Sequence, residues 1–148
     1  MSTPRSGIPG RLGRVVIVFR RRDREARRAV AATADHAHAD FHGRRLVAMD
    51  LRRKSFREAN LCGADLTESD LEHADLRGAN LRSTYLTGAQ LVGADLTGAC
   101  LDGAYLIAAN FRHAQLDGVS LDHAIWDEAT TWPDGRQDAR GPVGCRRP

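Results

Sequence analysis

The sequence predicts an all-β solenoid, and three observations support that prediction. A large apolar residue returns at every fifth position from Phe41 to Trp126, which makes eighteen consecutive units. Alanine stands two places before that residue in twelve of the units, and glycine stands two places after it in eight. A spacing of five also fits neither an α-helix nor a flat strand.

The spacing excludes both regular elements on geometric grounds. Five steps of ~100° advance a helical position by roughly 140°, so the leucines would spiral around a helix. Side chains alternate along a strand, so an odd spacing would point successive leucines to opposite faces. The chain must therefore turn a corner every five residues if each leucine is to point to a common axis. Each coil of such a solenoid is stabilised by its neighbours.

The units follow the pattern A-(D/N)-L-x-x, as in ANLCG from Ala59 and ADLTE from Ala64. Over residues 39–128 this pattern resembles the pentapeptide-repeat family. The resemblance implies a right-handed quadrilateral β-helix with four units per coil, hence about four to five coils, with the central and the small residue inside. The predicted core then consists of Leu61, Leu66, Leu71, Leu76, Leu81, Leu86, Leu91, Leu96, Leu101, Leu106, Phe111, Leu116 and Leu121.

The N-terminal segment, residues 1–38, is predicted to be a flexible basic tail followed by a short helix. Glycine and proline recur in residues 1–13, which is typical of a tail. Over 21–38, apolar residues such as Ala26 and Val30 recur at helical spacing, with arginines along another side. We expect this helix to lie over the open end of the first coil.

The two ends of the predicted solenoid depart from the motif. Three residues of the first coil, residues 39–58, stand where the motif has alanine, namely Arg44, Met49 and Lys54. That coil is therefore predicted to be irregular or covered by the N-terminal segment. At the other end, residues 129–148 are predicted to form a cap and a disordered tail. Trp126 and Trp132 would cover the last coil there, and Pro133 would stop its continuation.

Composition excludes several classes of protein. The longest apolar run, Val15 to Phe19, is shorter than the ~20 residues of a membrane span or the ~7 of a signal-peptide core. Three cysteines without a close pair argue against disulfides and favour the cytoplasm. No catalytic motif is present, so we expect no enzyme, no cofactor and no small-molecule substrate. His36, His38 and His42 lie close in sequence, but solvated surface is favoured over a metal site.

Charge divides the chain into a basic and an acidic part. Residues 1–38 carry nine arginines against three acidic residues (+6), whereas residues 58–128 carry three arginines against twelve carboxylates (−9). Tyr85 and Tyr105 are twenty residues apart and are predicted to stack, either as a recognition platform or as a ladder that stabilises adjacent coils. The candidate interaction surface comprises Asp65, Asp70, Asp75, Tyr85, Asp95, Asp102, Tyr105 and Asp122.

These features favour a protein-interaction scaffold with an unknown protein partner. The resemblance suggests an alternative, because some family members bind DNA gyrase and protect it from quinolones as acidic rods that mimic duplex DNA. Such mimics usually dimerise, so a homodimer is open too, although nothing in the sequence specifies a dimer face. A second alternative is association of the arginine-rich residues 20–28 with nucleic acid or an anionic membrane surface.

Overall fold

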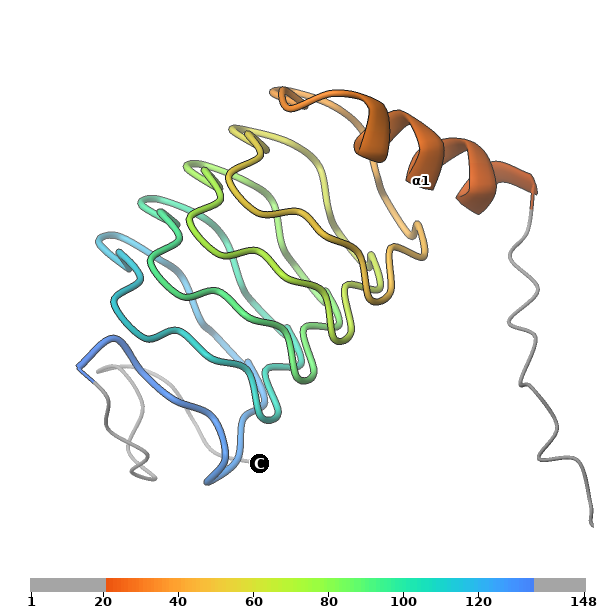
Figure 1. The fold of residues 1–148 in the computed structure, drawn as a ribbon. Helices are drawn as coiled ribbons and strands as arrows, with labels where there is room; N and C mark the ends of the chain where they lie inside the picture. The colour runs from red at the N-terminus through yellow and green to blue at the C-terminus, as the bar shows by residue number, and fades with distance from the viewer. Residues whose placement is uncertain (1–20, 135–148) are drawn as a thin grey trace, which may run out of the picture.

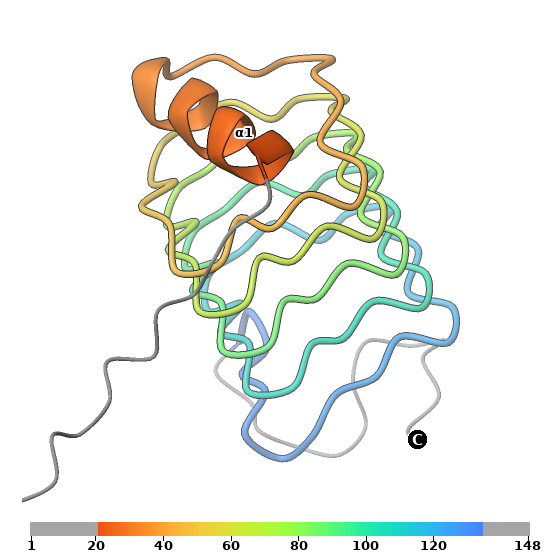
Figure 2. The same cartoon turned by 90° about the vertical axis from the view of Figure 1, so that its right-hand side faces the viewer.

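The computed structural model describes residues 21–134, which form one helix followed by a stack of coils (Figure 1). Residues 1–20 and 135–148, including the two predicted tails, lie outside the described part. Helix α1 spans Arg21–Ala32, and the coils follow it to the end of the described chain. Figure 2 shows that α1 lies across one open end of the stack.

The coils pair through single parallel bridges, and no bridge extends into a named strand within residues 21–134. The bridges join residues twenty apart, as in Asn60 with Asn80, and they form four columns along the stack. A coil therefore contains four five-residue units and has four sides. The predicted solenoid is present, but its strands are reduced to single bridges because the chain turns a corner after every few residues.

Each unit repeats the same hydrogen bonds. The carbonyl of Leu61 accepts the N–H of Ala64 at 3.0 Å and closes the corner. The N–H of Leu61 donates to the carbonyl of Asn80 in the next coil at 2.8 Å, and the N–H of Asn80 donates back to Ala59 at 2.9 Å. Every coil is thus joined to the next on all four sides, so the backbone sets the spacing of the side chains that stack inside.

The interior contains the apolar columns that the repeat predicts. The predicted core residues are buried except Leu116, which is partly buried, and Phe41, Leu46, Leu51 and Phe56 extend the core toward α1. Serine or threonine replaces the inward alanine at a few positions. Thr84 is fully buried there, and its Oγ1 donates to the carbonyl of Leu61 at 2.8 Å. The hydroxyl therefore keeps its hydrogen bond inside the apolar core, which makes the substitution tolerable.

At the N-terminal end, the ladder begins one unit earlier than the sequence predicts. Asp35 pairs with Ser55, and His36 occupies the central position, where its ring stacks on Phe56 at 5.1 Å. The helix correspondingly ends at Ala32 instead of residue 38. The ring of His36 lies near the carbonyl of Val30 at 3.2 Å, so it joins the helix end to the first coil.

Helix α1 covers the first coil, as predicted. Val30 is fully buried against the core, and Arg27 donates to the carbonyl of Val47 at 2.7 Å. Lys54 reaches the carbonyl of Thr33 at 2.5 Å, and Met49 is buried. The backbone of this coil keeps the regular bridges and corners, so the first coil is covered but not irregular. Long side chains fit there because no further coil lies beneath them.

At the C-terminal end, the ladder continues past residue 128, where the repeat is predicted to end. Thr131 pairs with Asn110, twenty-one residues away, so one residue is inserted before this last unit. Trp132 takes the central position above Phe111, with its ring stacked at 5.4 Å. Pro133 itself joins the pairing through its carbonyl, which accepts the N–H of His113 at 3.0 Å, and the continuation that it is predicted to stop would lie in residues outside the described part.

The corners carry a conformational strain that can be tested at two positions. Gly63 has φ +64°, and an added Cβ there would meet nothing within 4 Å, so Gly63→Ala tests the backbone alone. A left-handed non-glycine residue costs about 1–2 kcal/mol, partly offset by lower entropy of the unfolded chain. We expect Gly63→Ala to lower the free energy of unfolding by about 0.5–1 kcal/mol in urea denaturation.

The matched control for Gly63→Ala reverses the change. Ala48 occupies the same corner position with φ 52° and an exposed side chain. We expect Ala48→Gly to raise the free energy of unfolding by a similar amount. Equal stability of both variants and the wild type would show that the corners impose no such strain.

Candidate interaction surface

Uncharged side chains gather on one side of the coil, along the column of bridges from Tyr85 through Tyr105 to Ile125. Tyr85, 46% exposed, and Ile107, 37% exposed, are the large apolar side chains that stand exposed among residues 21–134. Thr87 and Ile107 occupy the adjoining corner position in neighbouring coils. We call this surface the tyrosine face and define it as Tyr85, Thr87, Tyr105, Ile107 and Ile125.

The two tyrosines of this face stack on each other as their spacing predicts. Their ring centroids lie 4.8 Å apart and the rings are inclined by only 6°. Each ring covers a face of the other, so the pair cannot admit a flat ligand between its rings. Ring edges remain available at the surface, and the bridged backbone fixes their positions. Rigid aromatic side chains of this kind are favoured at the centre of protein interfaces.

The predicted acidic residues do not join the tyrosines in one surface. Asp75 and Asp95 share a column on one side of the coil, and Asp70 lies in a different column. Asp102 and Asp122 lie beside the column of Cys100 and Ser120 on a third side. Only Asp65 shares the column of the tyrosine face, where it lies one coil nearer to α1 than Tyr85. The eight predicted residues are therefore spread over all four sides.

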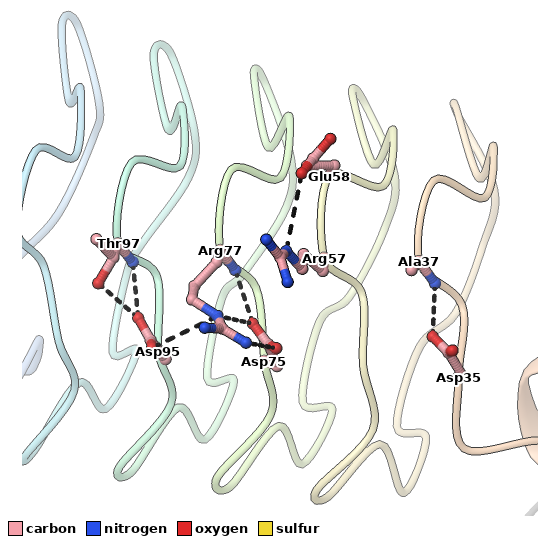
Figure 3. Close-up of polar contacts among 8 residues, drawn as sticks. All are labelled: Asp35, Ala37, Arg57, Glu58, Asp75, Arg77, Asp95 and Thr97. Atoms are coloured by element: carbon pink, nitrogen blue, oxygen red, sulfur yellow. Dashed lines mark hydrogen bonds and ion pairs between the residues drawn. The ribbon is translucent and has the colours of Figure 1, made fainter.

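Arginines pair with most of these carboxylates. Arg77 lies between the stacked Asp75 and Asp95, at 2.5 Å from the first and 3.7 Å from the second (Figure 3). One cation thus relieves the like-charge repulsion that stacking would otherwise cause. Arg52 lies in the same way between Asp50 at 2.7 Å and Asp70 at 3.5 Å. Two further arginines each pair with one aspartate, Arg45 with Asp65 at 3.6 Å and Arg82 with Asp102 at 3.3 Å.

Sequence reasoning missed these pairs, although a signal for them was present. Arg77 stands two residues after Asp75, as Arg52 does after Asp50, and both pairs bring the guanidinium onto the neighbouring carboxylate. An arginine two residues after an aspartate therefore indicates that the two side chains form an ion pair at a corner. The paired carboxylates are therefore neutralised locally, while the net charge of residues 58–128, which already includes Arg77 and Arg82, stays at −9.

The aspartates also hold the corners. Asp35 accepts the N–H of Ala37 at 3.0 Å, and Asp95 accepts that of Thr97 at 3.0 Å (Figure 3). This bond from Ala37 is the main cause that lowers the pKa of Asp35. The hydrogen bond from Arg77 likewise lowers the pKa of Asp75. A similar bond from Arg52 lowers the pKa of Asp50 to about 2.

At the C-terminal end, the carboxylate of Asp127 organises the inserted residue. It accepts the backbone N–H of Ala108 at 2.9 Å, and this bond is the main cause that lowers its pKa. It also accepts the N–H groups of Ala129 and Thr130 at 3.1 Å. Since one carboxylate holds three N–H groups, its ionised form is strongly preferred in the folded protein.

These shifts predict how stability depends on pH. Carboxyls with lowered pKa values bind fewer protons in the folded than in the unfolded chain, whose aspartates titrate near pH ~3.9. Their stabilisation is therefore present above about pH 4 and is lost as the pH falls through the lower folded values. We expect Asp127→Asn to be less stable than the wild type at neutral pH but to lose less stability below about pH 4. Urea denaturation across this range measures both, and parallel pH curves for the two proteins would contradict the expectation.

The arginines of α1 are partly engaged within the fold. Arg21 pairs with Glu25 at 3.0 Å, and Arg27 donates to the first coil. Asp23 is buried and accepts the N–H of Arg45 at 3.2 Å, so an acidic side chain of the helix holds it to the coil. The arginine-rich run therefore serves partly to attach the helix, which leaves less of it to contact nucleic acid or a membrane.

The histidines near the start of the coil are not brought together. His36 is buried in the core, whereas His38 is exposed and lies 3.4 Å from Glu58. His42 is exposed on the next side. Within residues 21–134 no three histidine, cysteine or acidic side chains are arranged to hold a metal ion.

An open hollow of about 450 Å³ lies between α1 and the first coil. Its floor includes Phe41 and Ala26, and its rim carries both charge signs, with Arg22 and Arg44 against Glu25 and Asp40. The lining brings together no catalytic pair. The helix beside it, the one helix of the described chain, is too short and too polar to cross a membrane.

Comparisons with known proteins agree with the repeat. The family model for pentapeptide repeats matches with eight copies over residues 34–72, 55–91, 64–103 and 89–125. No curated protein sequence matches the chain.

Three solved structures illustrate the likeness. A pentapeptide repeat protein from Nostoc PCC 7120, alr5209, is 32% identical, with 88% of this chain and 96% of that chain covered and a TM-score of 0.60. Rfr23 from the cyanobacterium Cyanothece 51142 is 31% identical over 64% of each chain, with a TM-score of 0.63. The plasmid-mediated fluoroquinolone resistance protein QnrB1 is 20% identical over 77% of this chain and 58% of its own, with a TM-score of 0.56, a likeness of fold.

Proposed function

This chain belongs to the pentapeptide-repeat family, and from that premise we propose that it is a non-enzymatic scaffold that binds a partner protein through the tyrosine face. The right-handed sense of the coil is part of the same proposal. One observation carries the choice of surface: the exposed large apolar side chains of the described chain, Tyr85 and Ile107, lie on the same side. Exposed apolar groups gathered on a rigid surface favour protein binding.

The tyrosine face is well prepared for binding. Tyr85 and Tyr105 are stacked and bridged, so little side-chain entropy remains to be lost on association. The charged pairs of the other three sides would have to be desolvated, which makes those sides poorer centres of an interface, whereas the pair on this side, Arg45 with Asp65, lies outside the tyrosine face. Hydroxyl groups of Thr87 and the tyrosines can form hydrogen bonds at the margin.

Substitution of Ile107 tests the proposal with a matched control. Ile107→Arg places a charge in the centre of the tyrosine face, whereas Val92→Arg places one at the same repeat position on the adjoining side. The full chain and both variants are used as bait, and the bound proteins are identified by mass spectrometry. We expect a partner that is retained by the wild type and Val92→Arg and lost with Ile107→Arg. Equal recovery of every bound protein by all three baits would refute the tyrosine face as the binding surface.

A DNA-mimic function is the alternative that the family and the net charge suggest. QnrB1 is a fluoroquinolone resistance protein of similar fold, and residues 58–128 carry a charge of −9, from three arginines against twelve carboxylates. Against this function, the acidic side chains are spread over all four sides of the coil, and arginines stand among them, with Arg77 at 2.5 Å from Asp75 and Arg82 at 3.3 Å from Asp102. We therefore expect no inhibition of DNA gyrase supercoiling at micromolar protein. Inhibition at that level would favour the mimic over the scaffold.

Association of residues 20–28 with nucleic acid or an anionic membrane has weaker support, because Arg27 contacts the first coil and Glu25 pairs with Arg21 on the helix surface. Such binding would fall steeply with salt.

We propose a cytoplasmic location on the cysteine content alone. A homodimer is a distinct form of protein binding that the tyrosine face allows.

A further inference from the structure

The arrangement of charge along the coil axis points to what the tyrosine face binds. Among the described residues, 21–57 carry eleven basic and five acidic side chains (+6), whereas 58–134 carry three basic and thirteen acidic (−10). The coils stack in sequence order, so the basic part lies at the α1 end and the acidic part at the far end (Figure 1). The molecule therefore has a strong axial separation of charge, and the tyrosine face lies along its side.

We propose that the partner of the tyrosine face is a second copy of this chain, bound antiparallel through the same face. This inference rests on the proposed function, since it assigns an occupant to that surface. A two-fold axis that passes through the tyrosine face and is perpendicular to the axis of the stack places the basic end of each copy beside the acidic end of the other. It also brings the uncharged strip from Tyr85 to Ile107 of one copy onto that of its partner, as an isologous interface requires.

Charge complementarity favours this arrangement over a parallel one. In a parallel pair, the α1 ends would face each other with like charge, and so would the acidic ends. The antiparallel pair reverses the order of charge and gains attraction at both ends. It also keeps the centre of the interface uncharged, because Tyr85, Thr87 and Ile107 occupy it. A second copy of this chain always carries the matching order of charge along its axis, whereas an unrelated protein would carry it only by chance.

The size of the face predicts a weak, reversible dimer. The whole side of the coil that carries the tyrosine face has five stacked bridge residues, from Arg45 to Ile125, so a contact along its full length would also include the pair of Arg45 and Asp65. At ~4.8 Å between neighbouring coils the strip is roughly 20 Å long, and one side is about 10 Å wide. Both surfaces together then bury on the order of 400 Å², below the ~1,200 Å² of a stable complex. We expect a dissociation constant in the micromolar range or weaker.

Analytical ultracentrifugation of the full chain tests the proposal. Over protein concentrations from about 1 µM to about 500 µM, we expect the wild type and Val92→Arg to pass from monomer to dimer. Ile107→Arg should weaken the dimer at least tenfold, and circular dichroism should show that both variants keep the wild-type melting temperature. A monomer at every concentration, or a dimer that ignores Ile107→Arg, would overturn the proposal.

The salt dependence of dimerisation distinguishes an antiparallel dimer from a parallel one. Screening weakens attraction between opposite ends, so the antiparallel dimer should dissociate as ionic strength rises from about 0.05 M to about 0.5 M. A dimer that salt strengthens would have like charges facing each other, which would contradict the antiparallel arrangement.

The two proposals fail in different ways. If the chain stays monomeric but Ile107→Arg still loses a captured protein, the second copy is excluded and the scaffold proposal stands. If neither dimerisation nor capture responds to Ile107→Arg, both proposals fail.

Discussion

Replacing Leu86 by alanine is expected to lower the free energy of unfolding by about 2–5 kcal/mol, near the upper end of that range. Leu86 is fully buried in the middle of the stack, in the column between Leu66 and Leu106. The surrounding backbone cannot collapse onto the cavity, because bridges such as Tyr85 to Tyr105 hold the adjacent coils at a fixed separation. Because Leu86 lies in a middle coil, its removal also weakens packing against the coils on both sides.

Urea denaturation followed by circular dichroism measures this loss. The matched control is Ile107→Ala, which shortens a similar side chain at an outward position and is expected to change stability by at most about 0.5 kcal/mol. Equal losses for Leu86→Ala and Ile107→Ala would contradict the inward and outward assignment of the repeat.

Trp132→Ala is expected to lower the free energy of unfolding by about 3–5 kcal/mol. The indole is 3% exposed, stacks on Phe111 at 5.4 Å and meets the edge of Trp126 at 5.7 Å. Trp132 therefore covers Phe111 and packs against Trp126, and we propose that the two tryptophans act as the cap of this end. Without Trp132, the end coil would expose its apolar interior to water.

A conservative change separates the stacking from the polar group of the indole. Within the described residues, the Nε1 atoms of Trp126 and Trp132 are buried and have no hydrogen-bond partner. Trp132→Phe keeps an aromatic ring over Phe111 and removes no hydrogen bond, so its loss in urea denaturation should be less than half that of Trp132→Ala. Similar losses for the two variants would mean that stacking over Phe111 is not what stabilises this end.

The departures from prediction occur at the two ends of the stack, and they have a common cause. His36 is predicted at the solvated surface, because residues 21–38 are assigned to a helix before the first coil, yet it is buried at the central position of an additional unit. Thr131 and Trp132 likewise continue the ladder after an inserted residue that breaks the period of five. At an end, one side of the coil has no neighbouring coil, so residues that do not fit the motif are accepted there.

The structure confirms the grouping of some predicted interaction residues and changes the role of others. Tyr85 and Tyr105 were placed together by simple register, and the structure stacks them. Asp75 and Asp95 share a column as well, but the pairing of both with Arg77 changes what they offer to a partner. Ile107 was not singled out, although it stands out once the neighbouring side chains of its side are known.

The sequence by itself determined the interior of this protein. A period of five with a large apolar residue in each unit settles which side chains point inward, because each corner depends only on residues close in the chain. The exterior was decided by the tertiary structure. Which surface groups become neighbours depends on residues twenty apart meeting across a coil, and on how α1 and Trp132 cover the ends. The stacking of Asp75 with Arg77 and Asp95, and the uncharged side formed by Tyr85 and Ile107, arise only from that closure.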